Sequence, residues 1–196
     1  MGMNRRLFIH VKKSWTIARR YLVTNGFDGA LTMLGLMAGF HVSGGVALPV
    51  AISVCLGTAV ALFMSGISSA YLSEAAERKK ELIELEGALL TNLQDSDYGH
   101  ASRYVPVLVA LVNGLSPLLI SLVIIAPLWC ANCGFLPPFL SPFILAMSIA
   151  LGSIFLLGVF LSSVSGTFWL WAGLRTLMIA VVTLVLILFI GGRLYI

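Results

Sequence analysis

The feature that most constrains this chain is the spacing of its charged residues. No Asp, Glu, Lys or Arg occurs in the 45 residues 29–73, and none occurs in the 71 residues 104–174. One membrane-spanning helix needs about 20 consecutive apolar residues. The first uncharged run is therefore long enough for two spans, and the second is long enough for two spans and the start of a third.

The overall composition agrees with that interpretation. The chain is 59% hydrophobic and only 10% charged, whereas a soluble domain carries about 25% charged residues. This composition excludes a water-soluble globule, a disordered chain and an ordinary nucleic-acid-binding protein. The apolar runs are also too long for the alternating strands of a membrane barrel. We therefore predict an all-α polytopic membrane protein with five transmembrane helices, an N-terminal amphipathic helix and a short cytoplasmic helical insert.

Glycine and proline clusters divide the two apolar runs into spans. Breaks are expected at Gly44-Gly45, at 130–138 and at 162–166, because these residues favour turns. The predicted spans are 27–45, 48–72, 104–128, 139–162 and 168–194. The resulting domains are an amphipathic cytoplasmic helix over 1–24, transmembrane helices 1–2 over 25–73, an acidic cytoplasmic insert over 74–103, and transmembrane helices 3–5 over 104–196.

The positions of Lys and Arg predict the orientation in the membrane, because cytoplasmic loops are rich in these residues. The basic residues outside the last span lie in the N-terminal segment and in the 73–103 loop: Arg5, Arg6, Lys12, Lys13, Arg19, Arg20, Arg78, Lys79, Lys80 and Arg103. We therefore expect the N-terminus and this loop to face the cytoplasm. The protein would be integral to the inner or plasma membrane of a prokaryote, or to a vacuolar-type membrane of a eukaryote.

The N-terminal segment has the pattern of an amphipathic helix. Its apolar residues share one helical face, with basic pairs recurring every seven residues beside it: Phe8, Val11, Trp15, Ala18 and Leu22. Such a helix would lie on the inner membrane surface and bind anionic lipid headgroups. The seven-residue recurrence also allows a coiled coil. Membrane lipids are thus predicted partners, and nucleic acids are not.

Seven of the eight acidic residues lie between positions 74 and 97. Glu74, Glu77, Glu81 and Glu84 fall within an arc of about 80° on a helix, where like charges repel one another. One interpretation is a solvated face that is neutralised by neighbouring Arg and Lys residues. The other is a binding surface for hard divalent cations, which prefer carboxylate oxygens.

Ionisable and polar residues inside the predicted spans are candidate functional groups. Asp28 opens the first span, as either a helix N-terminal acid or a cation gate. Met33 and Met37 are soft ligands or core residues, and His41 is a proton relay or a local hydrogen-bonding group. Arg175 in the last span either snorkels to the cytoplasmic surface or pairs with Asp28.

Two further groups leave several interpretations open. Asn113, Ser116 and Pro117 interrupt the third span, where Pro117 frees a backbone carbonyl that either lines a cavity or marks a kink. Cys130 and Cys133 have C-x-x-C spacing in an outer loop and form a disulfide, a redox pair or two free thiols. The chain has no nucleotide-binding G-x-x-x-x-G-K loop and no defensible nucleophile–base pair, so we do not expect an enzyme.

Four segments, in order, resemble the vacuolar iron transporter family (VIT/CCC-type). The first span carries Asp28-Gly29-Ala30-Leu31-Thr32, and the second ends in Tyr71-Leu72-Ser73 before an acidic helix. Asn113-Gly114-Leu115-Ser116-Pro117 resembles the third span, and the stretch from Gly173-Leu174-Arg175 to Gly191-Gly192-Arg193-Leu194 resembles the fifth. The resemblance covers residues 28–194.

The resemblance implies a proton-coupled exporter of cytosolic Fe²⁺ or Mn²⁺ that acts as a homodimer with its pore between protomers. The ion is the cargo, and no tightly bound cofactor is implied. Asp28 matches the pore-entrance acid of the family, and Glu74, Glu77, Glu81 and Glu84 fall where a metal-collecting helix begins. The candidate residues along the transport path are Met33, Met37, His41, Met64 and Asn113.

The chain departs from the family at two positions in the second span. Ala70 stands where the family has a glutamate, and Gly66 stands where it has a methionine. Met64 lies two residues earlier, about 200° away around the helix. These departures motivate an alternative function, a non-transporting membrane scaffold or accessory subunit of the same fold.

Overall fold

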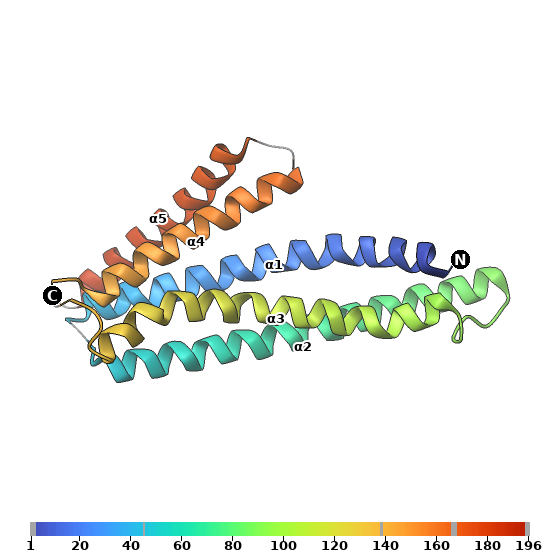
Figure 1. The fold of residues 1–196 in the computed structure, drawn as a ribbon, viewed down its shortest axis with the longest axis horizontal. Coiled ribbons are helices and arrows are strands. Elements are labelled where there is room, and N and C mark those ends of the chain that lie inside the picture. Colours follow the sequence, from blue (N-terminus) through green and yellow to red (C-terminus); the bar gives the residue numbers. More distant parts are fainter. Residues whose placement is uncertain (1–2, 45, 138, 166–167, 195–196) are drawn as a thin grey trace.

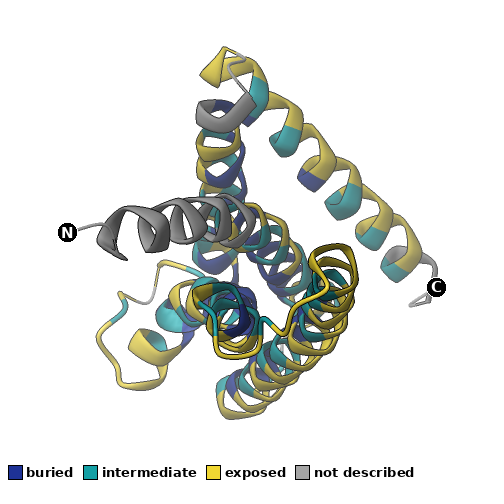
Figure 2. Ribbon diagram, turned by 90° about the vertical axis from the view of Figure 1, so that its right-hand side faces the viewer, coloured by how far each residue is buried: buried dark blue, intermediate teal, exposed yellow. Residues whose placement is uncertain are grey.

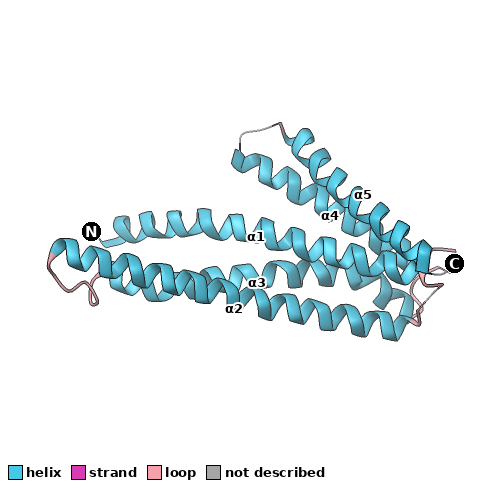
Figure 3. Cartoon of the chain, turned by 180° about the vertical axis from the view of Figure 1, so that it is seen from behind, coloured by secondary structure: helices cyan, strands magenta, loops and turns pink. Residues whose placement is uncertain are grey.

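The structure is a computed structural model that describes residues 3–44, 46–137, 139–165 and 168–194; within these, the side chains of 3–18, 163–165 and 192–194 are not described. Five helices run back and forth, and the two short ones, at the C-terminal end of the chain, pack beside the three long ones (Figures 1 and 3). The five helices are α1 (Met3–Val42), α2 (Leu48–Leu89), α3 (Asp97–Asn132), α4 (Pro142–Ser165) and α5 (Trp169–Leu194). The described residues contain no strand.

The first helix is longer than the sequence analysis suggests. α1 is one continuous helix of 40 residues, so the predicted N-terminal helix and the predicted first span are joined without a break. No proline occurs between Met3 and Val42 to interrupt the backbone hydrogen bonds. The predicted apolar face at Phe8, Val11, Trp15 and Ala18 lies outside the described side chains.

Helices α2 and α3 are too long to be membrane spans alone. At 1.5 Å per residue, the 42 residues of α2 and the 36 of α3 extend about 63 Å and 54 Å, whereas the hydrocarbon core of a bilayer is about 30 Å thick. Figure 1 shows that α1, α2 and α3 all continue past the C-terminal end of α4 and the N-terminal end of α5. Residues 74–103, the predicted insert, form a hairpin from the continuous ends of α2 and α3, and each of these helices is longer than one membrane crossing requires.

The tip of this hairpin is held by local hydrogen bonds. Leu90 ends α2 in the left-handed conformation with φ 50°. The Glu86 carboxylate accepts a hydrogen bond from the Leu93 backbone N–H at 2.9 Å. The Ser96 hydroxyl caps α3 by accepting from the Gly99 N–H at 3.2 Å. These contacts fix the reversal of direction without a glycine at the turn.

The core lies where α1, α3 and α4 meet near the end opposite the hairpin tip. It is built from fully buried side chains, among which the largest are Met33, Leu34, Met37, Ile124, Ile125, Leu128 and Ile154. Small residues bring the helices into close contact. A Cβ atom at Gly29 would lie 2.8 Å from the Pro117 Cα, and one at Gly114 would lie 2.7 Å from the Phe63 backbone oxygen. These contacts set the crossings of α1 with α3 and of α2 with α3.

The outer surface of the bundle is apolar. Four helices, α2 to α5, are long and apolar enough to cross a membrane, and α5 is exposed along most of its described length (Figure 2). α1 is less apolar, because residues 25–42 include Asn25, Asp28 and His41. Exposed apolar helices of this length are those of an α-helical integral membrane protein, which confirms the predicted fold class at this level.

Candidate functional site

Asp28 lies in the middle of α1 rather than at a helix end. The helix begins 25 residues earlier, at Met3, so Asp28 is not a helix N-terminal acid, and that interpretation is wrong. Its side chain is exposed. No described residue donates a hydrogen bond to the Asp28 carboxylate or forms an ion pair with it. The predicted ion pair between Arg175 and Asp28 is therefore not formed in the structure. As an exposed side chain, this carboxylate is accessible from outside the chain.

The position of Asp28 along the bundle places it among apolar residues. It lies 14 residues from the end of α1 at Val42, which corresponds to about 21 Å of helix. Its neighbour Gly29 packs directly against Pro117 of α3. This distance is shorter than the roughly 30 Å hydrocarbon core. α1 is not among the four described helices that are long and apolar enough to cross a membrane. A charge inside a membrane span is costly and usually marks a functional position.

Two of the four glutamates in the acidic stripe on α2 share one arginine. Arg78 lies between two glutamates, with its Nε 3.7 Å from Glu74 and its Nη1 3.1 Å from Glu81. The Tyr98 hydroxyl of α3 donates to the same Glu81 oxygen at 3.0 Å. The four residues form a polar cluster, Glu74–Arg78–Glu81–Tyr98, that joins the two helices of the hairpin. This arrangement agrees with the neutralised-face interpretation of the stripe.

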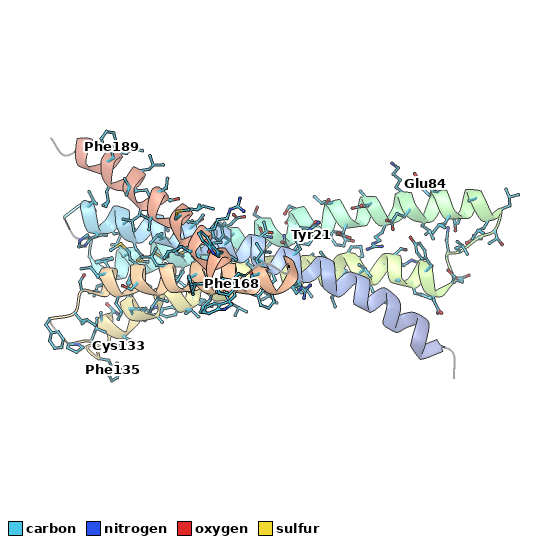
Figure 4. The ribbon with its side chains drawn as sticks, turned by 90° about the horizontal axis from the view of Figure 1, so that it is seen from above. Tyr21, Glu84, Cys133, Phe135, Phe168 and Phe189 are labelled. Carbon is cyan, nitrogen blue, oxygen red and sulfur yellow. The ribbon has the colours of Figure 1, made fainter. Side chains whose placement is uncertain are left out.

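The two remaining glutamates of the stripe are in a different environment. Glu77 is exposed, and Glu84 is paired only with Lys80 at 3.8 Å, where both side chains are largely exposed, at 66% and 79%. Figure 4 shows Glu84 pointing away from the hairpin. No group of three or more His, Cys, Asp or Glu side chains that would hold a metal ion occurs within the described residues. Within the described residues of this chain, the stripe is thus a set of ion pairs and exposed acids.

Glu74 is the buried member of the polar cluster, with 5% of its surface exposed. Burial raises the pKa of its carboxyl above the usual value, while the nearby Arg78 guanidinium acts in the opposite direction. Since the pKa is higher in the folded state, the folded protein binds the proton more tightly. The contribution of Glu74 to stability is therefore greatest at low pH, and it is lost as the pH rises through the folded pKa.

We expect Arg78→Ala to destabilise the protein, and to do so more at pH 8 than at pH 5. The substitution leaves the buried Glu74 without its cation, and an unpaired buried polar group costs about 1–3 kcal/mol. At low pH, protonation of Glu74 removes much of this cost. Thermal unfolding followed by circular dichroism at the two pH values measures the difference.

The matched control for this measurement is Lys80→Ala, which breaks the exposed pair with Glu84 on the same helix. Exposed pairs contribute about 0–1 kcal/mol, so this variant should melt like the wild type at both pH values. Equal destabilisation by Arg78→Ala at pH 5 and pH 8 would contradict the role given to Glu74.

The structure does not bring the predicted path residues together. Met33 and Met37 are fully buried in the core, in agreement with their interpretation as core residues. His41 is exposed near the end of α1, and Met64 is 53% exposed on α2. Asn113 is buried between α2 and α3, where its Nδ2 donates to the Gly66 carbonyl at 2.8 Å. Asn113 therefore joins two helices inside the protomer.

The same contact gives a packing reason for one of the two departures from the family pattern, Gly66. Gly66 and Ala70 are both buried on α2. A Cβ at Gly66 would lie 3.0 Å from the Gly114 Cα and 3.2 Å from the Asn113 backbone oxygen. A methionine at position 66 does not fit this crossing. In this chain, position 66 is used for contact with α3.

Sequence reasoning did not single out Tyr98 or Ser121, and it named Ser116 without predicting its partner. Tyr98 reaches Glu81 across the hairpin, and the Ser116 hydroxyl, which belongs to α3, donates to the Leu22 carbonyl of α1. Ser121 is fully buried, and its hydroxyl has no hydrogen-bond partner among the described residues. The eight-residue spacing of Asn113 and Ser121, about 80° apart around a helix, is the signal that places both on one face of α3.

The two C-x-x-C cysteines lie at the end of the bundle opposite the hairpin tip, as Figure 4 shows for Cys133 and its neighbour Phe135. Cys130 belongs to the last turn of α3, and Cys133 caps that helix. Both are free thiols and exposed, whereas Cys55 is a free thiol buried in the core. Of the three interpretations, the structure represents the state with two free thiols.

Comparisons with known proteins add one relative. The chain is 29% identical over 149 residues to the uncharacterized protein MJ0645 of Methanocaldococcus jannaschii, and the alignment covers 74% of each protein. No family model matches the chain, and no solved structure matches it. The comparisons thus leave the resemblance to vacuolar iron transporters as an inference from the motifs.

Proposed function

We propose that this protein exports divalent transition-metal ions, Fe²⁺ or Mn²⁺, from the cytoplasm by proton antiport. The observation that carries the proposal is Asp28, an exposed carboxylate in the middle of a helix, without a described partner and among apolar residues. A group of this kind can bind a cation in one step and a proton in the next, as antiport requires. In this proposal α1 is the fifth membrane-crossing helix, and the hairpin faces the cytoplasm.

A single protomer supplies too few ligands at Asp28 to hold a transition metal, because these ions take four to six. We therefore include a homodimer in the proposal, with Asp28 facing the equivalent carboxylate of a second copy across the pore. The exposed acids Glu77 and Glu84 would raise the local concentration of cations near the cytoplasmic end. The Glu74–Arg78–Glu81–Tyr98 cluster would hold the hairpin rigid instead of binding metal.

The experiment is metal uptake into vesicles that contain the full-length protein with its cytoplasmic side outward. An acidic lumen provides the proton gradient, and Fe²⁺ or Mn²⁺ is added outside. We expect uptake that rises with the gradient and falls when a protonophore collapses it. Protein-free vesicles under the same gradient give the background.

The second candidate is a non-transporting membrane scaffold. Two observations favour it: the ion pairs of Glu74 and Glu81 with Arg78, and the packing of Gly66 against α3 where the family has a methionine. Under this function the same vesicles take up no divalent ion, with or without the gradient. That result would refute the exporter proposal.

A further inference from the structure

The C-x-x-C pair lies at a helix end that restricts the distance between the two cysteines. Cys133 donates its backbone N–H to the Trp129 carbonyl at 3.0 Å, and Phe135 donates to the Cys130 carbonyl at 2.9 Å. Both cysteines are thereby held in the final turn of α3. Residues three apart on a helix have Cα atoms about 5 Å apart, which is within the 4.4–6.8 Å range of disulfides. The backbone is therefore already positioned for a bond between them.

The C-terminal residue of the pair has freedom to adjust. Cys133 is the C-cap of α3, with φ −85° and ψ 0°, and Gly134 follows with φ 76°. Because no further helical turn follows Cys133, its side chain can move toward Cys130 without breaking the helix. A disulfide here closes a very small ring, which restricts the unfolded chain little compared with a long-range bridge. Such a bond is suited to reversible exchange more than to stabilising the fold.

The surroundings of the pair also bear on its chemistry. Both thiols are exposed, so small disulfides can reach them. No charged residue occurs in positions 104–174, so no neighbour in sequence provides a cation that would activate a thiolate. The distribution of Lys and Arg predicts that this end of the bundle faces away from the cytoplasm. Disulfides persist on that side, because it lacks the reducing systems of the cytoplasm. These surroundings favour a pair of cysteines that is oxidised and reduced by small molecules over the active site of a thiol-exchange enzyme.

We propose that Cys130 and Cys133 form a reversible dithiol–disulfide pair at the outer end of α3, which exchanges electrons with small-molecule disulfides. One thiolate attacks the substrate disulfide, which produces a mixed disulfide and releases one thiol. The second thiolate then attacks the mixed disulfide, closes the Cys130–Cys133 bond and releases the second thiol. Two electrons and two protons pass from the pair to the substrate disulfide. This inference is independent of metal transport.

The test uses the purified full-length protein equilibrated with oxidised and reduced glutathione at a series of ratios. The reaction is quenched with acid, and free thiols are then counted by maleimide labelling and mass spectrometry under denaturing conditions. In the oxidised range we expect the loss of two of the three maleimide additions, with no glutathione attached. Only the buried Cys55 should remain labelled.

Single substitutions distinguish this pair from unrelated thiol reactions. Cys130→Ser and Cys133→Ser each leave one exposed thiol, which should retain one bound glutathione instead of losing it. Cys55→Ser should keep the wild-type behaviour of the pair. Stable glutathione adducts on the wild type, disulfide-linked dimers, or three labelled thiols throughout the series would each overturn the proposal.

Discussion

Replacing Asp28 by Asn should reduce proton-driven uptake of Fe²⁺ or Mn²⁺ to the level of protein-free vesicles. Asn keeps the size of the side chain but removes its charge and its ability to carry a proton. At an effective dielectric constant near 20, a unit charge about 4 Å away contributes on the order of 4 kcal/mol. Since each 1.36 kcal/mol is tenfold in rate, we expect a decrease of at least about 100-fold.

The matched control is Asp95→Asn, the same chemical change at an exposed acid in the turn between α2 and α3. Asp95 lies far along the hairpin from Asp28, and an exposed charge is screened over roughly 10 Å in salt. Removal of the Asp95 charge should therefore leave uptake within about twofold of the wild type. Circular dichroism should show the same helix content for both variants. Wild-type uptake by Asp28→Asn would remove Asp28 from the mechanism, even if the protein itself transports metal.

The second large effect is expected at the crossing of α2 and α3, where Gly114→Ala should destabilise the fold. The added methyl group would lie 2.6 Å from the Ile67 Cγ1 and 2.7 Å from the Phe63 backbone oxygen. Because the oxygen belongs to the backbone of α2, the two helices must separate. Overpacking of this kind costs about 1–3 kcal/mol, and the nearby bond from Asn113 to the Gly66 carbonyl would be strained as well.

The control for this prediction is Gly57→Ala on α2, where no atom lies within 4 Å of the added Cβ. An alanine in open space on a helix should change stability by no more than about 1 kcal/mol, in the stabilising direction. Unfolding in increasing concentrations of SDS, followed by circular dichroism, compares the two variants. If Gly114→Ala unfolds at the same concentration as Gly57→Ala, the close crossing is not a stabilising contact.

The helices were predictable because uncharged runs and turn residues are local features of the sequence. The breaks expected near Gly44 and at 130–138 agree with the end of α1 at Val42 and the end of α3 at Asn132. The continuity of α1 was harder to predict. The composition changes from basic to apolar between the N-terminal segment and the predicted first span, and such a change resembles a boundary between two helices. A helix continues through such a change when no proline or cap interrupts its hydrogen bonds.

The site was less predictable for a different reason. Ion pairs between Arg78 and its glutamates follow from three- and four-residue spacing on one helix, and the sequence analysis included them. The Tyr98–Glu81 bond joins residues 17 apart, and the Asn113–Gly66 bond joins residues 47 apart. Contacts of this kind depend on how two helices are placed against each other. Whether Gly66 replaces a ligand or makes a helix contact is a question of tertiary packing.

The unbroken length of α1 has a mechanical consequence. Beyond Asp28 the helix is packed on several sides, since Gly29 lies against Pro117 and both Met33 and Met37 are fully buried. Because no break separates the basic segment of α1 from this packed segment, a force on the basic segment is not absorbed at a joint. It acts directly on the backbone that carries Asp28.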